Sequence, residues 1–266
     1  MSNTTWMIAA GCAVLAAGLA QANRDARSAP EAPPAAPGAS EAPAAPATPA
    51  ATVPAAGASV RLRGDAAVTV SLDERGMAGI PGTVYRLSAP LPDGYPMPTP
   101  AGMLELKSYP SVRRAEIDAG GAARVAMNVS FFPLLSHIKS RDIPMTTPVE
   151  VDVVADGAGA SDATARMAAQ RWKISFLYRT ASLGPAGGDG RIRVVDTEPV
   201  TVVSLGIAGW YSERVGTEAL AEIDRWLAEH PEWEAVGQPR SLNYSGPGDE
   251  PWLEVQRPVR PRASGR

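Results

Sequence analysis

Residues 28–59 are almost entirely Ala, Pro, Gly, Thr, Ser and Glu, and none of them is aromatic. A chain of this composition cannot bury enough apolar surface to offset the entropy lost on ordering. Its many prolines favour extended, polyproline-like conformations. We therefore predict a disordered, semi-stiff linker over residues 23–59. Residues 60–262 are enough for one domain with a sizeable core, and 263–266 form a short tail.

An apolar run, Trp6–Ala20, precedes the linker. It is shorter than the about 20 residues that a membrane-spanning helix needs. Ala20-Gln21-Ala22 offers the small residues that signal peptidase accepts. Residues 1–22 are therefore predicted to be a signal peptide or, if uncleaved, a short membrane anchor. A third interpretation is a lipoprotein box at residues 9–12. Each of these predicts an exported protein, either periplasmic or tethered on the extracytoplasmic side of a membrane.

Charge and cysteine content argue against several function classes. A formal net charge of -3 at pH 7 offers no electrostatic case for binding nucleic acid. Cys12 is the only cysteine, so residues 60–262 have no disulfide, no cysteine nucleophile and no cysteine metal site.

Catalytic motifs are also missing from the sequence. It contains no Gly-rich phosphate loop after a strand, no G-x-S-x-G and no H-E-x-x-H. The carboxylates of Asp142, Glu150 and Asp152 fall at loop or alternating strand positions, where we expect them to be solvated. A Ser-His-Asp arrangement assembled in space around His137 stays open. The prediction is a binding protein that is not an enzyme.

Several segments alternate between apolar and polar residues with period two, which is typical of strands. Val200–Leu205 is instead a continuous apolar-rich run, as expected of a strand buried on both faces. The alternating strands are predicted at Val60–Leu62, Val68–Val70, Leu104–Lys107, Val112–Ile117, Val149–Val153, Trp172–Tyr178 and Trp252–Val255.

Two segments show helical spacing. The first runs from about Ser130 to Lys139, with Pro133 tolerated only within the first turn. The second begins at Thr217 as N-cap and ends at His230-Pro231. The order is strands, helix, strands, and then strands, helix, strands again. This order predicts an α+β fold of two similar halves, each a helix on antiparallel strands.

Residues 131–149, FFPLLSHIKSRDIPMTTPV, resemble the most recognisable stretch of the SOUL haem-binding family. In that family a helix of pattern F-x-x-L-x-x-Y-I is followed by M-T-x-P-V entering a strand. Met145–Val149 matches the second element fully. Further similar segments occur in the same order, so the resemblance covers residues 103–257. They are Leu104–Ile117, Trp172–Tyr178, Gly206–Tyr211, Tyr244–Pro247 and Trp252–Val255.

The resemblance implies a distorted antiparallel β-barrel of two pseudo-repeated halves with two helices packed on it. It also implies a carrier or sensor of haem or a related tetrapyrrole, which binds on an apolar surface at the first helix. A module of the same fold for another flat apolar ligand or a protein partner stays open, and so does a small-substrate enzyme. The residues implied to line the slot are Phe131, Leu134, Leu135 and Ile138, with Lys139 and Arg141 as the local cations.

The chain has two histidines, which narrows the choice of an iron ligand. His137 replaces the aromatic residue of the family pattern, and the resemblance implies that it is the axial ligand. The alternative is a partly exposed helix residue whose ring nitrogen is satisfied. His230 is explained by its place at the end of the second helix, where a histidine suits the helix dipole.

Overall fold

The computed structural model describes residues 51–155, 170–246 and 248–263. The predicted signal peptide, anchor or lipoprotein box lies outside the described residues, as does most of the predicted linker. Residues 51–59 are described, and Gly57 N–H donates to Ser108 O at 2.7 Å while Ser108 N–H donates to Ala58 O at 3.1 Å. This last part of the predicted linker therefore pairs with the folded domain. No described helix is long and apolar enough to cross a membrane.

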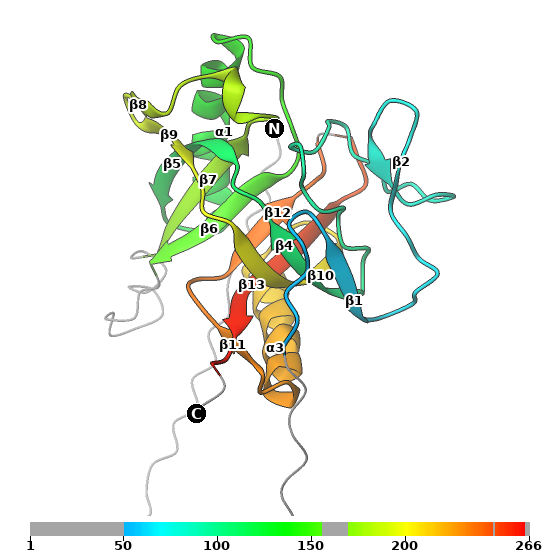
Figure 1. Cartoon of the computed structure of the whole chain (residues 1–266). Coiled ribbons are helices and arrows are strands. Elements are labelled where there is room, and N and C mark those ends of the chain that lie inside the picture. Colours follow the sequence, from blue (N-terminus) through cyan, green and yellow to red (C-terminus); the bar gives the residue numbers. More distant parts are fainter. Residues whose placement is uncertain (1–50, 156–169, 247, 264–266) are drawn as a thin grey trace, which may run out of the picture. The chain divides into compact units, whose positions relative to one another are not determined.

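The domain is built on one antiparallel sheet of eleven strands (Figure 1). Ten of them follow the order β1-β4-β10-β13-β12-β6-β7-β5-β9-β8, and β11 pairs with β13. Among the described residues the edge strands β1 and β8 do not pair with each other, so the barrel-like sheet stays open. The strands are β1 (Ser59–Arg63), β4 (Leu104–Tyr109), β5 (Arg113–Gly120), β6 (Val149–Ala155), β7 (Arg171–Leu177), β8 (Gly187–Asp189), β9 (Ile192–Asp196), β10 (Val200–Ala208), β11 (Trp233–Ala235), β12 (Arg240–Asn243) and β13 (Trp252–Pro261).

The sheet consists of two similar halves, as predicted. One half is β5, a helix, β6 and β7, and the other is β10, a helix, β12 and β13. Within the sheet the strand order is β6-β7-β5 in the first half and β12-β13-β10 in the second. The two halves meet where β6 pairs with β12. The strand that precedes each half joins the other half: β4 pairs with β10, and β9 pairs with β5. The two halves are therefore interlocked through exchanged strands.

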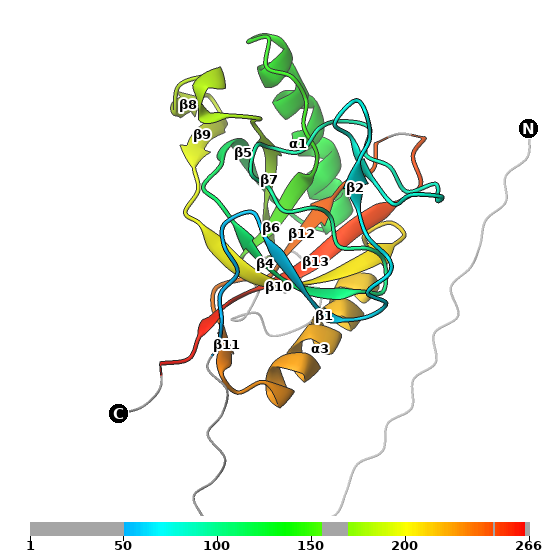
Figure 2. The ribbon, with the colours of Figure 1, turned by 45° about the vertical axis from the view of Figure 1, so that its right-hand side comes forward.

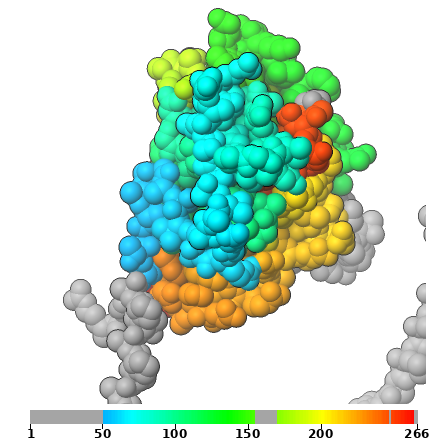
Figure 3. Space-filling view, turned by 90° about the vertical axis from the view of Figure 1, so that its right-hand side faces the viewer, coloured from blue at the N-terminus to red at the C-terminus, as the bar shows by residue number. Residues whose placement is uncertain are grey.

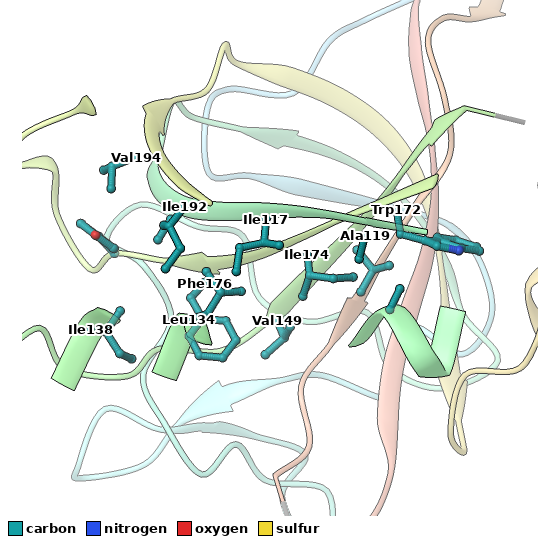
Figure 4. Close-up of a cluster of buried hydrophobic side chains, with 14 of the residues drawn as sticks. Ile117, Ala119, Leu134, Ile138, Val149, Trp172, Ile174, Phe176, Ile192 and Val194 are labelled. Atoms are coloured by element: carbon teal, nitrogen blue, oxygen red, sulfur yellow. The ribbon is translucent and has the colours of Figure 1, made fainter. Parts of the chain in front are cut away.

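Both helices pack on the same face of the sheet. Helix α1 (Ala123–Lys139) contacts β5 and β7, and helix α3 (Glu213–Glu229) contacts β10 and β13. Figure 4 shows side chains of α1 meeting those of the strands, with Leu134 and Ile138 directed at the sheet. The α3 side contributes Ile223 and Trp226 to a second cluster. A short 3-10 turn, η1 (Ala181–Leu183), precedes β8.

The other face of the sheet is overlaid by residues 64–103, which we call the covering segment (Figures 2 and 3). It contains the two-residue strands β2 (Ser71–Leu72) and β3 (Ala78–Gly79). Its Leu87 and Tyr95 pack in a third cluster with sheet residues such as Leu242 and Trp252. At Gly206 an added Cβ would lie 2.2 Å from Pro100 O, so only glycine allows the covering segment to cross β10 this closely.

Both helices begin earlier than predicted. Helix α1 starts at Ala123 rather than near Ser130, so Pro133 lies inside it rather than in its first turn. Helix α3 starts at Glu213, and Ser212 is its N-cap, with Oγ accepting from Val215 N–H at 3.2 Å. The hydroxyl of Thr217, the predicted cap, instead donates to Glu213 O at 2.8 Å within the helix.

The strand predictions are largely confirmed, and the shorter strands are where they fail. Val68–Val70 is not a strand, and β2, β3, β8, β9, β11 and β12 were not predicted. Met145–Val149, the family-like motif, leads into β6 and anchors neighbouring segments. The hydroxyl of Thr146 donates to Leu177 O at 2.6 Å, and that of Thr147 donates to Ala89 O of the covering segment at 2.8 Å.

Candidate functional site

The sheet face beneath the covering segment carries a row of charged side chains, which we call the charged face. Successive side chains of a strand point to opposite faces. Val149 and Val151 therefore pack toward α1, while Glu150 and Asp152 point the other way. Cations and carboxylates are linked across this face from β1 to β9 by ion pairs, with Gln256 as a neutral bridge. The charged residues are Arg61, Glu105, Lys107, Glu254, Arg240, Glu150, Arg114, Glu116 and Arg193.

Glu254 is the centre of the part that the covering segment closes, and it has no exposed surface. Lys107 Nζ donates to its Oε1 at 2.7 Å, and Thr99 N–H donates to the same oxygen at 2.5 Å. Ser204 Oγ and Gln256 Nε2 donate to Oε2 at 2.7 and 2.5 Å. Burial acts to raise the pKa of Glu254, but Lys107 and these donors outweigh it and hold the pKa below its usual range. The hydrogen-bonding capacity and the charge of this carboxylate are therefore satisfied by groups of the protein itself.

A partly open cavity of about 280 Å³ lies on the charged face where the two halves meet, beside Tyr95. Tyr95 comes from the covering segment, and the other walls come from six strands and the loops beside them. Among the described residues that line it there is no serine, cysteine or histidine. The lining includes Tyr95, Tyr109, Arg114, Asp152, Val200 and Arg240.

Glu150 lies fully buried between two of the lining arginines. Nη1 of Arg114 donates to Glu150 Oε2 at 2.6 Å, and Nη1 of Arg240 donates to Oε1. Nε of Arg240 donates to Gln256 Oε1 at 2.8 Å, and its Cζ lies 4.8 Å from the centre of the Tyr109 ring. The arginines thus share one carboxylate, and stacking on an aromatic ring fixes the plane of Arg240.

Nη2 of Arg240 is buried and has no hydrogen-bond partner. Nη2 of Arg114 also takes no part in the hydrogen bonds among the described residues, which use its Nε and Nη1. An unsatisfied buried donor costs about 1–3 kcal/mol, and more when it is charged. Most buried polar groups in folded proteins have partners, and this nitrogen is an exception within the packed interior, with less than 1 Å² of accessible surface.

The pKa values of the two carboxylates of β6 are shifted in opposite directions. Burial acts to raise the pKa of Glu150, but Arg240 and Arg114 outweigh it and hold that pKa below its usual range. The pKa of Asp152 is raised, mainly by burial and secondly by repulsion from the negative charge of Glu150. The Asp152 side chain is 22% exposed, with Oδ2 2.9 Å from Arg114 Nη1. Two neighbouring acids with opposite pKa shifts beside a cavity mark a candidate functional site.

The apolar residues predicted to line a ligand slot on α1 are mostly core. Leu134 and Ile138 are 0% and 3% exposed and pack against the sheet (Figure 4). Phe131 is half-buried, with its ring centre 5.1 Å from that of Phe176, and Leu135 is half-buried against the same cluster. The expected open slot is therefore corrected for Leu134 and Ile138, because α1 turns this stripe to the sheet.

His137 is also directed inward, at 4% exposure. Its Nδ1 lies 3.0 Å from Asp189 Oδ2, and its Nε2 lies 2.9 Å from the Tyr178 hydroxyl. Both ring nitrogens are thus engaged, so coordination of iron would require one of these contacts to break. Its role as an iron ligand stays a prediction that this geometry does not favour.

The polar residues near His137 serve the protein's own contacts. Arg141, predicted as a cation near the slot, donates from Nη2 to Asp189 Oδ2 at 2.9 Å. Lys139 is exposed.

The other histidine, His230, lies at the end of α3, with Nδ1 2.7 Å from Trp226 O. No group of three or more His, Cys, Asp or Glu side chains within the described ranges is placed to hold a metal ion.

Sequence reasoning missed the residues of the cavity. Arg114, Arg240 and Asp152 come from three strands, and each alone looks like an ordinary polar position. A signal existed, because Glu150 and Asp152 alternate with valines while Arg114 and Glu116 alternate with Ala115 and Ile117. Charged residues on the same period in several strands indicate that those strands share a charged face.

Comparison with known proteins identifies no family for this chain. No family model matches the sequence, and no curated protein matches it. The assignment to the SOUL family therefore stays a prediction that rests on the motifs quoted above.

Solved structures give distant matches. The C-terminal domain of EcmrR is 14% identical, with a TM-score of 0.45, over 60% of this chain and 98% of that one. A hydrolase encoded by lin2189 from Listeria innocua is 16% identical, with a TM-score of 0.44, over 61% of this chain and 94% of that one. SAV2435, solved with tetraphenylphosphonium bound, is 8% identical, with a TM-score of 0.34, over 58% and 92% of the two chains. At these scores the similarity assigns no function.

Proposed function

We propose that this chain is a binding protein that holds a small molecule in the cavity between the charged face and Tyr95. The observation that carries the proposal is the cavity itself, a space of about 280 Å³ lined by the side chains of Arg114, Arg240 and Tyr95. Arg114 and Arg240 together hold Glu150, and Arg114 is also paired with Glu116 and Asp152. Nη2 of Arg114 and the hydroxyl of Tyr95 take no part in hydrogen bonds among the described residues, and both side chains line the cavity, so an acceptor group on a ligand could bind them.

In this proposal the ligand is bound and released without chemical change. The described lining has no serine, cysteine or histidine, and its acids are Asp152, which lies 2.9 Å from Arg114, and the exposed Glu198. What it offers is a set of N–H and O–H donors held in place by ion pairs and an aromatic ring. Fixed donors around a small cavity suit recognition.

Filling the cavity should abolish binding. Val200 lines it, so in Val200→Phe the added ring would occupy ligand space, whereas the control Val154→Phe changes an exposed residue of β6 that is not part of the lining. Benzoate, benzamide and benzamidine are probes of one size with negative, zero and positive charge. A probe at ten times its Kd should raise Tm of the wild type by roughly 3–6 °C. We expect that shift in Val154→Phe and none in Val200→Phe. A shift that survives in Val200→Phe would place the probe elsewhere.

A second candidate, haem or another flat apolar ligand, is favoured by one feature of α1. Val125, Val129 and Phe132 are 54%, 51% and 72% exposed and form one stripe at helical spacing on its outer face. The family resemblance leads us to propose haem for this stripe. His137 does not fit the iron ligand in this arrangement, because both its ring nitrogens are engaged.

Haemin titration of the full chain tests this second candidate. It predicts a saturable, shifted Soret band that is weakened about tenfold or more in Phe132→Ser and unchanged in His137→Ala. Loss of the band in His137→Ala alone would restore the histidine as iron ligand. No saturable binding at micromolar haemin would exclude haem as the ligand.

A further inference from the structure

We infer that the outer face of α1 docks on an anionic lipid surface, with Val125, Val129 and Phe132 inserted among the acyl chains and the cations of the helix at the headgroups. This inference goes beyond the proposed cavity function, because α1 packs on the face of the sheet opposite the charged face. Three features of the described residues support it: the exposure of these side chains, the charge of the helix, and the size of the apolar area.

The outer face of α1 is apolar where a surface helix is normally polar. Val125, Val129 and Phe132 are each more than half exposed and recur at helical spacing, so they form one stripe. The equivalent helix of the other half, α3, exposes no large apolar side chain. Its exposed positions include the acids Glu218 and Asp224 instead. Both helices cover the same face of the sheet, so packing within the domain does not account for this difference.

Helix α1 carries cations but no acid. Its 17 residues contain no aspartate or glutamate. Arg124 lies in the first turn, and Lys139 lies seven residues after Phe132 on the same side of the helix, and both cations are exposed. Among the described residues neither is in an ion pair, whereas Arg141, just beyond the helix, is paired with Asp189. An apolar stripe with a cation at each end suits a surface that is apolar inside and negatively charged outside.

The size of the stripe argues against a protein partner. From Val125 to Phe132 it spans two helical turns, or about 10 Å. A stable protein interface takes roughly 800 Å² from each partner, far more than three side chains provide. A second copy of the chain would also bring no carboxylate from its own α1 to these cations. A bilayer needs no complementary groove, because side chains of a convex helix enter it one by one.

In this arrangement α1 lies on the bilayer and does not cross it. Within the described ranges no helix is long and apolar enough to span a membrane. The inner face of α1 is already engaged, since Leu134 and Ile138 pack against the sheet. The long side chain of Lys139 can reach the headgroups while Phe132 enters the acyl region. With so few inserted side chains, binding should be reversible and should weaken as salt screens the cations.

A dye that reports the polarity around one side chain tests the inference. Cys12 is the only cysteine, so Val129→Cys in a full-length Cys12→Ser background gives one site on the stripe for a nitrobenzoxadiazole label. Ala221→Cys in the same background puts the label at an exposed position of α3 as the matched control. Vesicles of phosphatidylcholine and phosphatidylglycerol should raise the emission at position 129 about twofold or more, with a shift to shorter wavelength. The emission at position 221 should not change.

The readout is local to the helix, because the apolar run at the N-terminus could attach the whole chain to vesicles without α1. Phe132→Ser in the labelled chain should remove most of the response. Lys139→Glu should raise the lipid concentration needed for half the response by roughly tenfold, since it replaces attraction to the headgroups by repulsion. Vesicles of phosphatidylcholine alone should give a much smaller response.

Several results would overturn the inference. No response at position 129, or an equal response at position 221, would show that the stripe does not insert. An equal response to phosphatidylcholine alone would show that the cations play no part. A wavelength shift that grows with protein concentration in the absence of vesicles would assign the stripe to a second copy. A saturable response to haemin, with none to vesicles, would assign it to haem.

Discussion

Replacing Lys107 with methionine is expected to lower the free energy of unfolding by about 3–5 kcal/mol. Lys107 and Glu254 are both fully buried, with Nζ 2.7 Å from Oε1. Methionine fills much the same volume but leaves the Glu254 carboxylate charged and uncompensated in the interior. Urea denaturation followed by circular dichroism at pH 7 measures the loss, as a lower midpoint at unchanged slope.

Two variants show whether the loss comes from the orphaned charge. Lys107→Met combined with Glu254→Gln should recover a large part of the stability, because no buried charge is then left alone. Arg260→Met breaks an exposed ion pair with Glu234 and should cost no more than about 1 kcal/mol. A loss below about 1 kcal/mol in Lys107→Met alone would contradict the description of Glu254 as a carboxylate that depends on this lysine.

Leu134→Ala is expected to destabilise the domain by about 2–5 kcal/mol, because it opens a space in the cluster between α1 and the sheet. Leu134 is fully buried there, whereas Phe132, two residues earlier, is 72% exposed. Phe132→Ala should therefore change stability by no more than about 0.5 kcal/mol. Thermal and urea unfolding of the two variants side by side measure the difference. A small effect of Leu134→Ala would mean that this residue lines an accessible slot, as the sequence motif suggested.

The two-half α+β organisation could be predicted because the longer strands alternate strongly. Segments such as Trp172–Tyr178 and Val149–Val153 have large apolar residues on one face, and they are strands β7 and β6 in the structure. The exchange of β4 and β9 between halves could not be predicted, since pairing partners far apart in sequence leave no local pattern. β8 and β11 have three residues each, too few to show a period.

The start of α1 was missed because the buried positions of its first half are small. Ala123, Ala126 and Ser130 face the core, and small residues give little apolar periodicity. The N-cap, Ala122, makes no side-chain hydrogen bond that would mark the boundary. Pro133 misled the prediction as well. It is exposed and lies inside the helix, whose following turn is held by the buried Leu134 and Ile138.

The charged face was misjudged for a different reason. The alternation of polar and apolar residues shows that Glu150 and Asp152 share a face of the sheet, but it does not show whether that face is exposed to solvent. The covering segment, whose sequence shows no clear period, lies over this face and removes water from it. Glu150 is consequently fully buried and Asp152 partly so, where solvation was expected. A cavity that depends on such a cover was not predictable from strand patterns.

The most direct test of the proposed cavity site is to map the probes by ¹H–¹⁵N NMR on the full chain. The proposal predicts that the bound probe shifts backbone amides around the cavity, with Tyr95, Asp152 and Arg240 among the largest changes. It also predicts that these shifts disappear in Val200→Phe. Shifts concentrated instead on Val125, Val129 and Phe132 would contradict the cavity site and move ligand binding to the outer face of α1.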